Sequence, residues 1–138
     1  MASWRWTHGY VEDVAAAITL AIVDERAVGS TYNIGEASTP LWAEWVREIG
    51  RAVGWDGEVV AVPAHRLPEH LNQGLDTRQH LFTDTSRIRR ELGYEEAVSR
   101  REALRRAVVW ERQHPPAGVE PAFFDYAAED AVLTDLGR

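Results

Sequence analysis

Every amphipathic segment of this sequence is short and ends at a glycine or a proline. Gly29 follows the segment 11–25, Gly54 follows 40–53, Gly93 follows 87–92, and Pro115 follows the segment that begins at Arg100. Glycine readily adopts the left-handed backbone conformation that closes a helix, and proline cannot continue one. The spacing of these residues predicts a fold built mainly from short helices.

Four of these helices have recognisable start signals or faces. Between 11 and 25, apolar residues recur at three- and four-residue steps and predict one buried helix face: Val11, Val14, Ala15, Ile18, Ala21 and Ile22. A hydroxyl N-cap at 38–39 followed by Pro40 predicts a second helix, running to about Val53. Residues 84–86 should cap a short helix over 87–92. Ser99 and Glu102 form a capping box for a helix that ends near His114.

Two segments favour strands, and the tail favours a further helix. Residues 30–34 and 58–62 are rich in β-branched and aromatic side chains and are followed by Gly35 and Pro63, which predicts two short strands. The tail after Pro121 is too apolar to remain free in water, so we expect a last helix from about Tyr126 that packs on the rest of the chain. The predicted class is α/β, with helices predominating.

Composition limits the chemistry and the partners. The chain has 138 residues, no cysteine, and 15 basic side chains that are all arginine. Without lysine, it supplies neither a P-loop lysine nor a Schiff-base lysine. The net charge of −7 disfavours nucleic acid as a partner. We expect a cytoplasmic protein without a membrane association, because no apolar run approaches a spanning length and the first residues do not resemble a secretion signal.

The usual catalytic and metal-binding patterns are absent from the sequence. His65 and His70 are five residues apart with Pro68 between them, which does not match the i, i+4 spacing of helical zinc ligands. The serines lie in no Gly-x-Ser-x-Gly elbow, and the glycines form no Gly-x-Gly-x-x-Gly loop. The adjacent acids Glu12 and Asp13 fall in a first helical turn, where acids commonly complement the helix dipole. We therefore predict no catalytic residue, no metal site and no cofactor bound by this chain alone.

Four segments, in order, resemble one family. Residues 8–18 (HGYVEDVAAAI), 29–35 (GSTYNIG), 84–94 (DTSRIRRELGY) and the helix over 99–110 are similar to segments of the extended short-chain dehydrogenases, the NAD-dependent epimerase/dehydratase family. All four belong to the carboxyl-terminal half of that family. The nucleotide-binding loop and the Tyr-x-x-x-Lys pair belong to the other half, and the absence of lysine agrees with their absence here.

The resemblance implies a domain organisation and a set of ligands. Residues 1–116 would form the substrate-binding lobe of a Rossmann-type protein without its nucleotide-binding half, and 117–138 a tail with a short helix that packs on the lobe or on a partner. NAD or NADP would be the cofactor of a full-length relative, and a nucleotide sugar or another small molecule its substrate. The parent reaction would be epimerisation, dehydration or reduction.

Three residues are the substrate-binding candidates that the resemblance implies. Arg5 stands near the family's arginine ahead of the His-Val-x-Asp segment, and Arg78 and Asp84 lie near positions that can reach a ribose or a phosphate. The planar guanidinium of arginine suits phosphate because it donates two parallel hydrogen bonds. Simpler interpretations exist: Asp84 as a helix N-cap, and Arg78 as a solvated loop charge.

Three hypotheses for the function follow. The first is a substrate-binding portion of an epimerase/dehydratase-like protein that is not catalytic by itself. The second is a stand-alone interaction or self-association module derived from that lobe. The third is an independent small enzyme that uses histidine or glutamate. An unpaired strand and an apolar helix face are usually covered, so we expect a dimer formed through residues 11–35, or a complex with the missing half.

Overall fold

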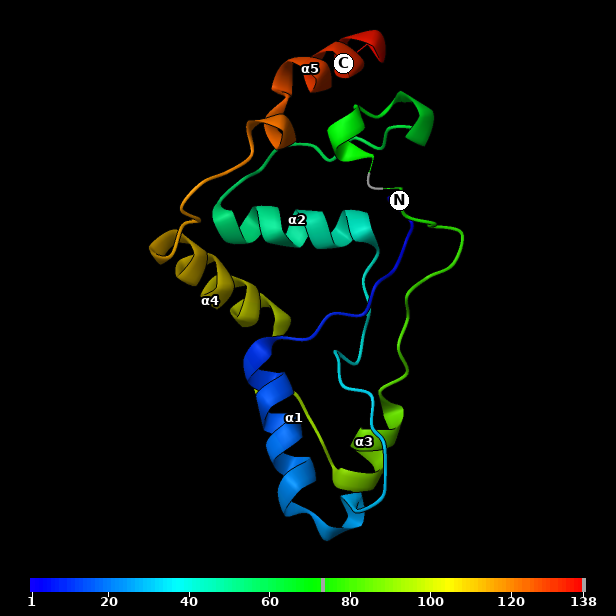
Figure 1. Ribbon diagram of the computed structural model, residues 1–138, viewed down its shortest axis with the longest axis vertical. Helices are drawn as coiled ribbons and strands as arrows, with labels where there is room; N and C mark the ends of the chain where they lie inside the picture. The colour runs from blue at the N-terminus through cyan, green and yellow to red at the C-terminus, as the bar shows by residue number, and fades with distance from the viewer. Residues whose placement is uncertain (73, 138) are drawn as a thin grey trace.

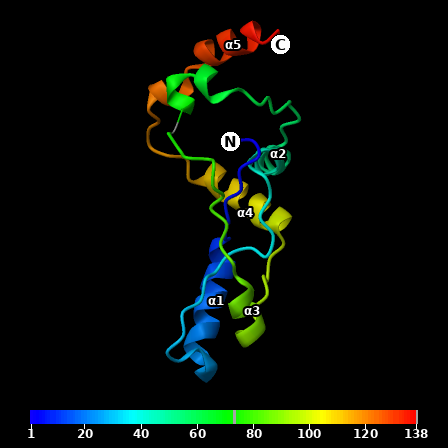
Figure 2. The same cartoon turned by 90° about the vertical axis from the view of Figure 1, so that its right-hand side faces the viewer.

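The computed structural model describes residues 1–72 and 74–137 and is an elongated arrangement of short helices (Figures 1 and 2). The α-helices are α1 (Val11–Val23), α2 (Trp42–Val53), α3 (Ser86–Leu92), α4 (Arg100–Gln113) and α5 (Tyr126–Asp135). The connections also contain 3-10 turns: η1 (Glu25–Ala27) follows α1, η2 (Ala64–Arg66) and η3 (Glu69–Leu71) lie between α2 and α3, and η4 (Pro121–Phe124) precedes α5. α1 and α3 lie side by side at one end in both views, α2 and α4 lie in the middle, and α5 lies at the other end.

The helix ends follow the local chemistry of the sequence. Ser99 Oγ accepts a hydrogen bond from the Glu102 backbone N–H at 3.4 Å and so caps α4, which confirms one half of the predicted capping box. The Glu102 carboxylate pairs with Arg105 and Arg106 in place of the return bond. Gly54 and Gly93 close α2 and α3 with φ of 83° and 73°, in the left-handed region where a side chain is strained. The predicted tail helix is present as α5. These ends depend on contacts within one turn, which is why the sequence predicts them.

The start of α2 differs from the prediction. The helix begins at Trp42, and Glu44 Oε2 accepts a hydrogen bond from the Leu41 backbone N–H at 2.8 Å. Ser38 does not cap it, because Ser38 Oγ instead accepts a hydrogen bond from the Arg100 guanidinium at 2.9 Å. The hydroxyl that was predicted to cap α2 thus bonds to Arg100, a residue distant in the sequence.

The two predicted strands were wrong. Residues 30–34 and 58–62 are not assigned as strands, and the β pairing within the described ranges consists of isolated bridges, Arg5 with Leu41 and Trp6 with Leu81. A strand exists only when a neighbouring backbone supplies its hydrogen bonds. No described segment lies in register with 30–34, so this segment is extended but unpaired. The structure is therefore α-rich, with almost no β-structure.

The main core lies between α1 and α3. Ile88 and Ala17 are fully buried there, and Leu92 and Tyr94 complete the buried cluster; partly buried residues around it are Leu20, Ala21, Ala27, Tyr32 and Ile34. The predicted inner face of α1 was wrong in its orientation. Val11, Ile18 and Ile22 are 72%, 49% and 77% exposed, whereas Asp13 and Ala17 are buried. α1 is apolar on both sides, so periodicity alone could not choose the buried one.

The tail packs on the turns that precede α3. η4 contacts η3, and His70 Nε2 lies 2.9 Å from Glu129 Oε1 of α5, with the His70 side chain only 8% exposed. Arg66 also pairs with Asp135. Residues 64–71 and the tail therefore form the second end of the molecule. The imidazole of His70 already has a hydrogen-bond partner there, the carboxylate of Glu129.

Candidate functional site

The three substrate-binding candidates of the sequence each have a partner within the chain. The Arg5 guanidinium donates to the Thr39 carbonyl. Arg78 pairs with Asp76 at 2.6 Å, and its side chain is 88% exposed. Asp84 Oδ1 accepts the Ser86 backbone N–H at 2.8 Å at the start of α3, and this bond lowers the pKa of the Asp84 carboxyl. No described interaction joins the three residues, and their substrate-binding role stays a prediction.

An aromatic cluster, which the sequence analysis did not identify, lies between the N-terminal segment and α2. Trp4 is buried, and its indole Nε1 donates to the Gln79 carbonyl at 2.7 Å. Trp6 stacks on Trp42 with ring centroids 6.4 Å apart and planes 18° apart. The extended backbone of residues 4–8 places alternate side chains on the same side, which brings the His8 ring to the same cluster, 5.2 Å from Trp6.

A pocket of about 390 Å³ opens over Trp6, His8 and Trp45. The His8 ring stacks on Trp45 with centroids 4.0 Å apart and an interplanar angle of 18°. His8 Nδ1 is buried without a hydrogen-bond partner among the described residues. Burial, followed by the nearby charge of Arg100, lowers the pKa of the His8 imidazole. The lowered pKa favours the neutral imidazole near pH 7.

The polar side of this pocket is the ion pair of Glu36 and Arg100. Arg100 Nε lies 2.5 Å from Glu36 Oε2, and the two side chains are 22% and 13% exposed. Burial raises the pKa of the Glu36 carboxyl, and the hydrogen bond from Arg100 acts against that rise. Arg100 also donates to the Ser38 carbonyl, so two residues of the segment 36–38 hold its guanidinium.

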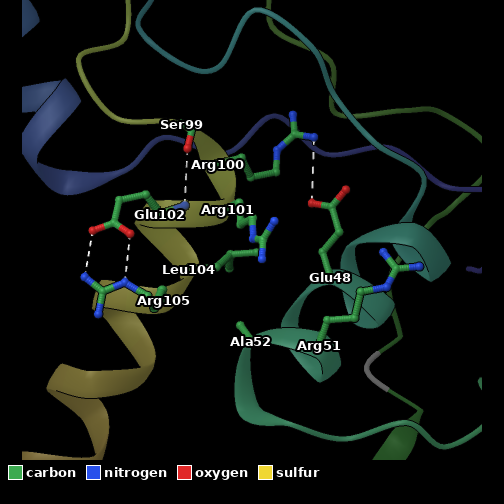
Figure 3. A pocket seen from close by; sticks show the side chains of 9 residues that line it. All are labelled: Glu48, Arg51, Ala52, Ser99, Arg100, Arg101, Glu102, Leu104 and Arg105. Atoms are coloured by element: carbon green, nitrogen blue, oxygen red, sulfur yellow. Dashed lines mark hydrogen bonds and ion pairs between the residues drawn. The ribbon is translucent and has the colours of Figure 1, made fainter.

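Arg100 lines two further hollows. One, of about 400 Å³, lies against Tyr10, Glu36 and Glu96. The other is a cleft of about 790 Å³ between α2 and α4 (Figure 3). We name the pocket over Trp6, His8 and Trp45 the aromatic pocket. Arg100, which is partly buried, lines this pocket and both hollows.

The aromatic pocket can bind a flat ring. Indole faces stack on aromatic rings and on other apolar faces, while Glu36 and Arg100 supply polar groups at the edge of the pocket. No group of three or more His, Asp or Glu side chains that could hold a metal ion occurs in the described ranges. The aromatic pocket is a candidate binding site, and its titratable lining groups are His8, Tyr10, Glu36 and Arg100.

A signal for the aromatic pocket was present in the sequence. Trp4, Trp6 and His8 alternate along an extended segment, and Trp42 and Trp45 are three residues apart on one helix face. Four of the six tryptophans of the chain therefore lie in two short stretches. Nothing in either stretch reveals that they meet, because the contact between residues 4–8 and α2 is a tertiary one.

Comparisons of the chain with models of protein families, with curated proteins and with solved structures give no match. The family resemblance of the four sequence segments therefore stays a hypothesis. None of the described helices has both the length and the apolar character needed to cross a membrane.

Proposed function

We propose that this chain is the substrate-binding lobe of an NAD(P)-dependent epimerase/dehydratase-like protein and that it acts only when a nucleotide-binding half covers α1. The substrate, a nucleotide sugar or a small molecule with a comparable ring, would lie in the aromatic pocket. NAD or NADP, and the catalytic groups, would come from the covering half. The proposal draws on the four ordered sequence segments and on the exposed apolar surface of α1.

The exposed stripe of α1 carries this proposal. The helix has Glu12 and Asp13 as its only charged side chains, and a helix that is apolar all round is normally buried on every side. One side packs on the α3 core. The other side exposes Val11, Ile18 and Ile22, which recur at the spacing of one helix face. We name this face the α1 stripe.

The unpaired segment 31–34 supports a sheet as the covering element. Tyr32 and Ile34 face the core, while Thr31 and Asn33 are exposed, which is the alternation of a half-buried strand. The backbone N–H groups of 31–34 donate to no described residue. A neighbouring strand could pair with this segment while its sheet covers the α1 stripe, as helices cover parallel sheets in α/β proteins.

The accessible surface supports a large partner. The chain exposes 9941 Å², whereas a compact monomer of 15.6 kDa would expose about 7,250 Å² by the usual scaling with mass. The excess of about 2,700 Å² is comparable with the area that obligate complexes bury. A second copy of this chain could cover the same surface, and that self-association module is the alternative function.

Expression of the chain alone and joined to the polypeptide encoded upstream of Met1 tests the proposal. We expect the chain alone to bind neither NAD nor NADP in calorimetric titrations, and the joined protein to bind one of them stoichiometrically. Hydrogen exchange in α1 and 31–34 should slow in the joined protein. Stoichiometric binding by the chain alone, or an upstream sequence without a nucleotide-binding pattern, would refute the proposal.

A pair of charge variants separates the two functions. Ile18→Arg together with Ile22→Arg places charges on the α1 stripe, and Ala16→Arg is the matched control because Ala16 is exposed on a different face of α1. In the joined protein, we expect the double variant to lose the slowed hydrogen exchange of α1 and 31–34, and the Ala16→Arg control to keep it. Sedimentation that shows a dimer of the chain alone, abolished by the double variant and unchanged in the control, would favour the self-association module.

A further inference from the structure

The cleft between α2 and α4 is locally positive in an acidic chain. Its charged lining consists of four arginines and two glutamates, a net charge of +2, in a protein with a net charge of −7: Arg51, Arg100, Arg101, Arg105, Glu48 and Glu102. The chain as a whole has more acidic than basic side chains. The positive charge of the cleft is therefore a local feature and does not follow from the composition.

Some of these charges are already neutralised by neighbours. Glu102 accepts hydrogen bonds from Arg105 at 2.7 Å and from Arg106 at 2.9 Å. Arg100 is held by Glu36, with Glu48 3.8 Å away. Figure 3 shows the pair of Glu102 with Arg105 within α4 and the pair of Arg100 with Glu48, which joins α4 to α2.

Arg51 and Arg101 remain without a partner. Within residues 1–72 and 74–137, every other arginine side chain makes a hydrogen bond or an ion pair, and these two make neither. They come from opposite walls: Arg101 extends from α4 towards α2, and Arg51 lies along α2 near Glu48 (Figure 3). Both are exposed, so their guanidinium groups can turn towards a ligand.

We propose that the cleft binds a phosphate dianion between Arg51 and Arg101. A guanidinium donates two parallel hydrogen bonds to phosphate oxygens, and two of them match the two negative charges. The first turn of α4 borders the same cleft, where the helix dipole adds to the attraction. The phosphate could be a free ion or the end of a small phosphate ester. The cleft shares Arg100 and Leu104 with the aromatic pocket, but Arg51 and Arg101 do not line that pocket. The phosphate site therefore does not depend on the proposed function.

Calorimetric titration of the whole chain with inorganic phosphate, methyl phosphate and diphosphate tests the site. We expect Arg51→Gln and Arg101→Gln each to weaken the binding of inorganic phosphate about tenfold, the loss of one charge-assisted contact. Arg101→Lys should weaken it less, because it keeps the charge without the planar fork. Arg47→Gln is the control: Arg47 is an exposed arginine of α2 that bonds only to the Ala43 carbonyl and does not line the cleft.

The outcomes are distinct. Weakening in the Arg51 and Arg101 variants, with Arg47→Gln unchanged and all variants retaining the helical circular dichroism of the parent, supports the site. Equal affinity for methyl phosphate and inorganic phosphate then identifies an ester as an acceptable ligand, and a preference for the free ion identifies the ion. No binding at millimolar phosphate or diphosphate, or equal losses in Arg47→Gln, would overturn the proposal.

Discussion

Replacing Asp13 by alanine should destabilise the connection between α1 and the loop that leads into α4. Asp13 is only 4% exposed, and its Oδ1 accepts the backbone N–H groups of Ala97 at 2.9 Å and Val98 at 3.2 Å. A hydrogen bond to a charged acceptor contributes about 1.5–3 kcal/mol, and its loss leaves a partly buried donor without a partner. Because both bonds share one oxygen, we expect a total loss of about 3 kcal/mol.

Urea unfolding followed by circular dichroism measures this loss as the change in the free energy of unfolding. Asp13→Asn keeps an acceptor oxygen and should lose about half as much. Glu12→Ala is the matched control, because Glu12 is the adjacent acid but is exposed, and its pair with Arg106 should contribute less than about 1 kcal/mol. A loss below about 1 kcal/mol for Asp13→Ala, or one equal to that of Glu12→Ala, would refute the reasoning.

Three further predictions concern the core and the titratable groups. Ile88→Ala should lower the free energy of unfolding by about 2–5 kcal/mol in the same assay, because Ile88 is fully buried between α1 and α3. The pKa of His8 is lowered below its ordinary 6.5, so the unfolded chain binds the proton more readily and stability should fall as the pH drops below about 6.5; His8→Gln should reduce that fall. Arg105 and Arg106 lower the pKa of Glu102 to about 2, and NMR titration should find this pKa higher in Arg106→Ala.

The candidate site shows where sequence reasoning stops. Arg5, Arg78 and Asp84 could be selected by position, but each forms a bond to a nearby group or to a backbone carbonyl. Arg100 follows the capping serine of α4 and is unremarkable in the sequence, yet it joins Glu36 and lines three hollows. Its importance arises from a pairing of residues 64 positions apart, which no local pattern encodes.

The two acids in the first turn of α1 also differ in a way that the local sequence does not predict. Glu12 and Asp13 have the same local setting in the sequence, and the helix dipole favours both. The fold separates them, because Glu12 points to solvent and Asp13 to the backbone of Ala97 and Val98. Their chemistry was predictable, and the burial that gives one of them a structural role was not.

The sequence by itself determined the helices and where they end. Ser99 caps α4, and Gly54 and Gly93 close α2 and α3, because these signals act within a single turn. Only the tertiary structure decided which side of α1 is buried, since both sides are apolar, and whether 30–34 is a strand, since a strand requires a neighbour. It also decided that the N-terminal tryptophans meet α2. Local hydrogen bonds fix the elements, and packing between distant segments fixes their faces and partners.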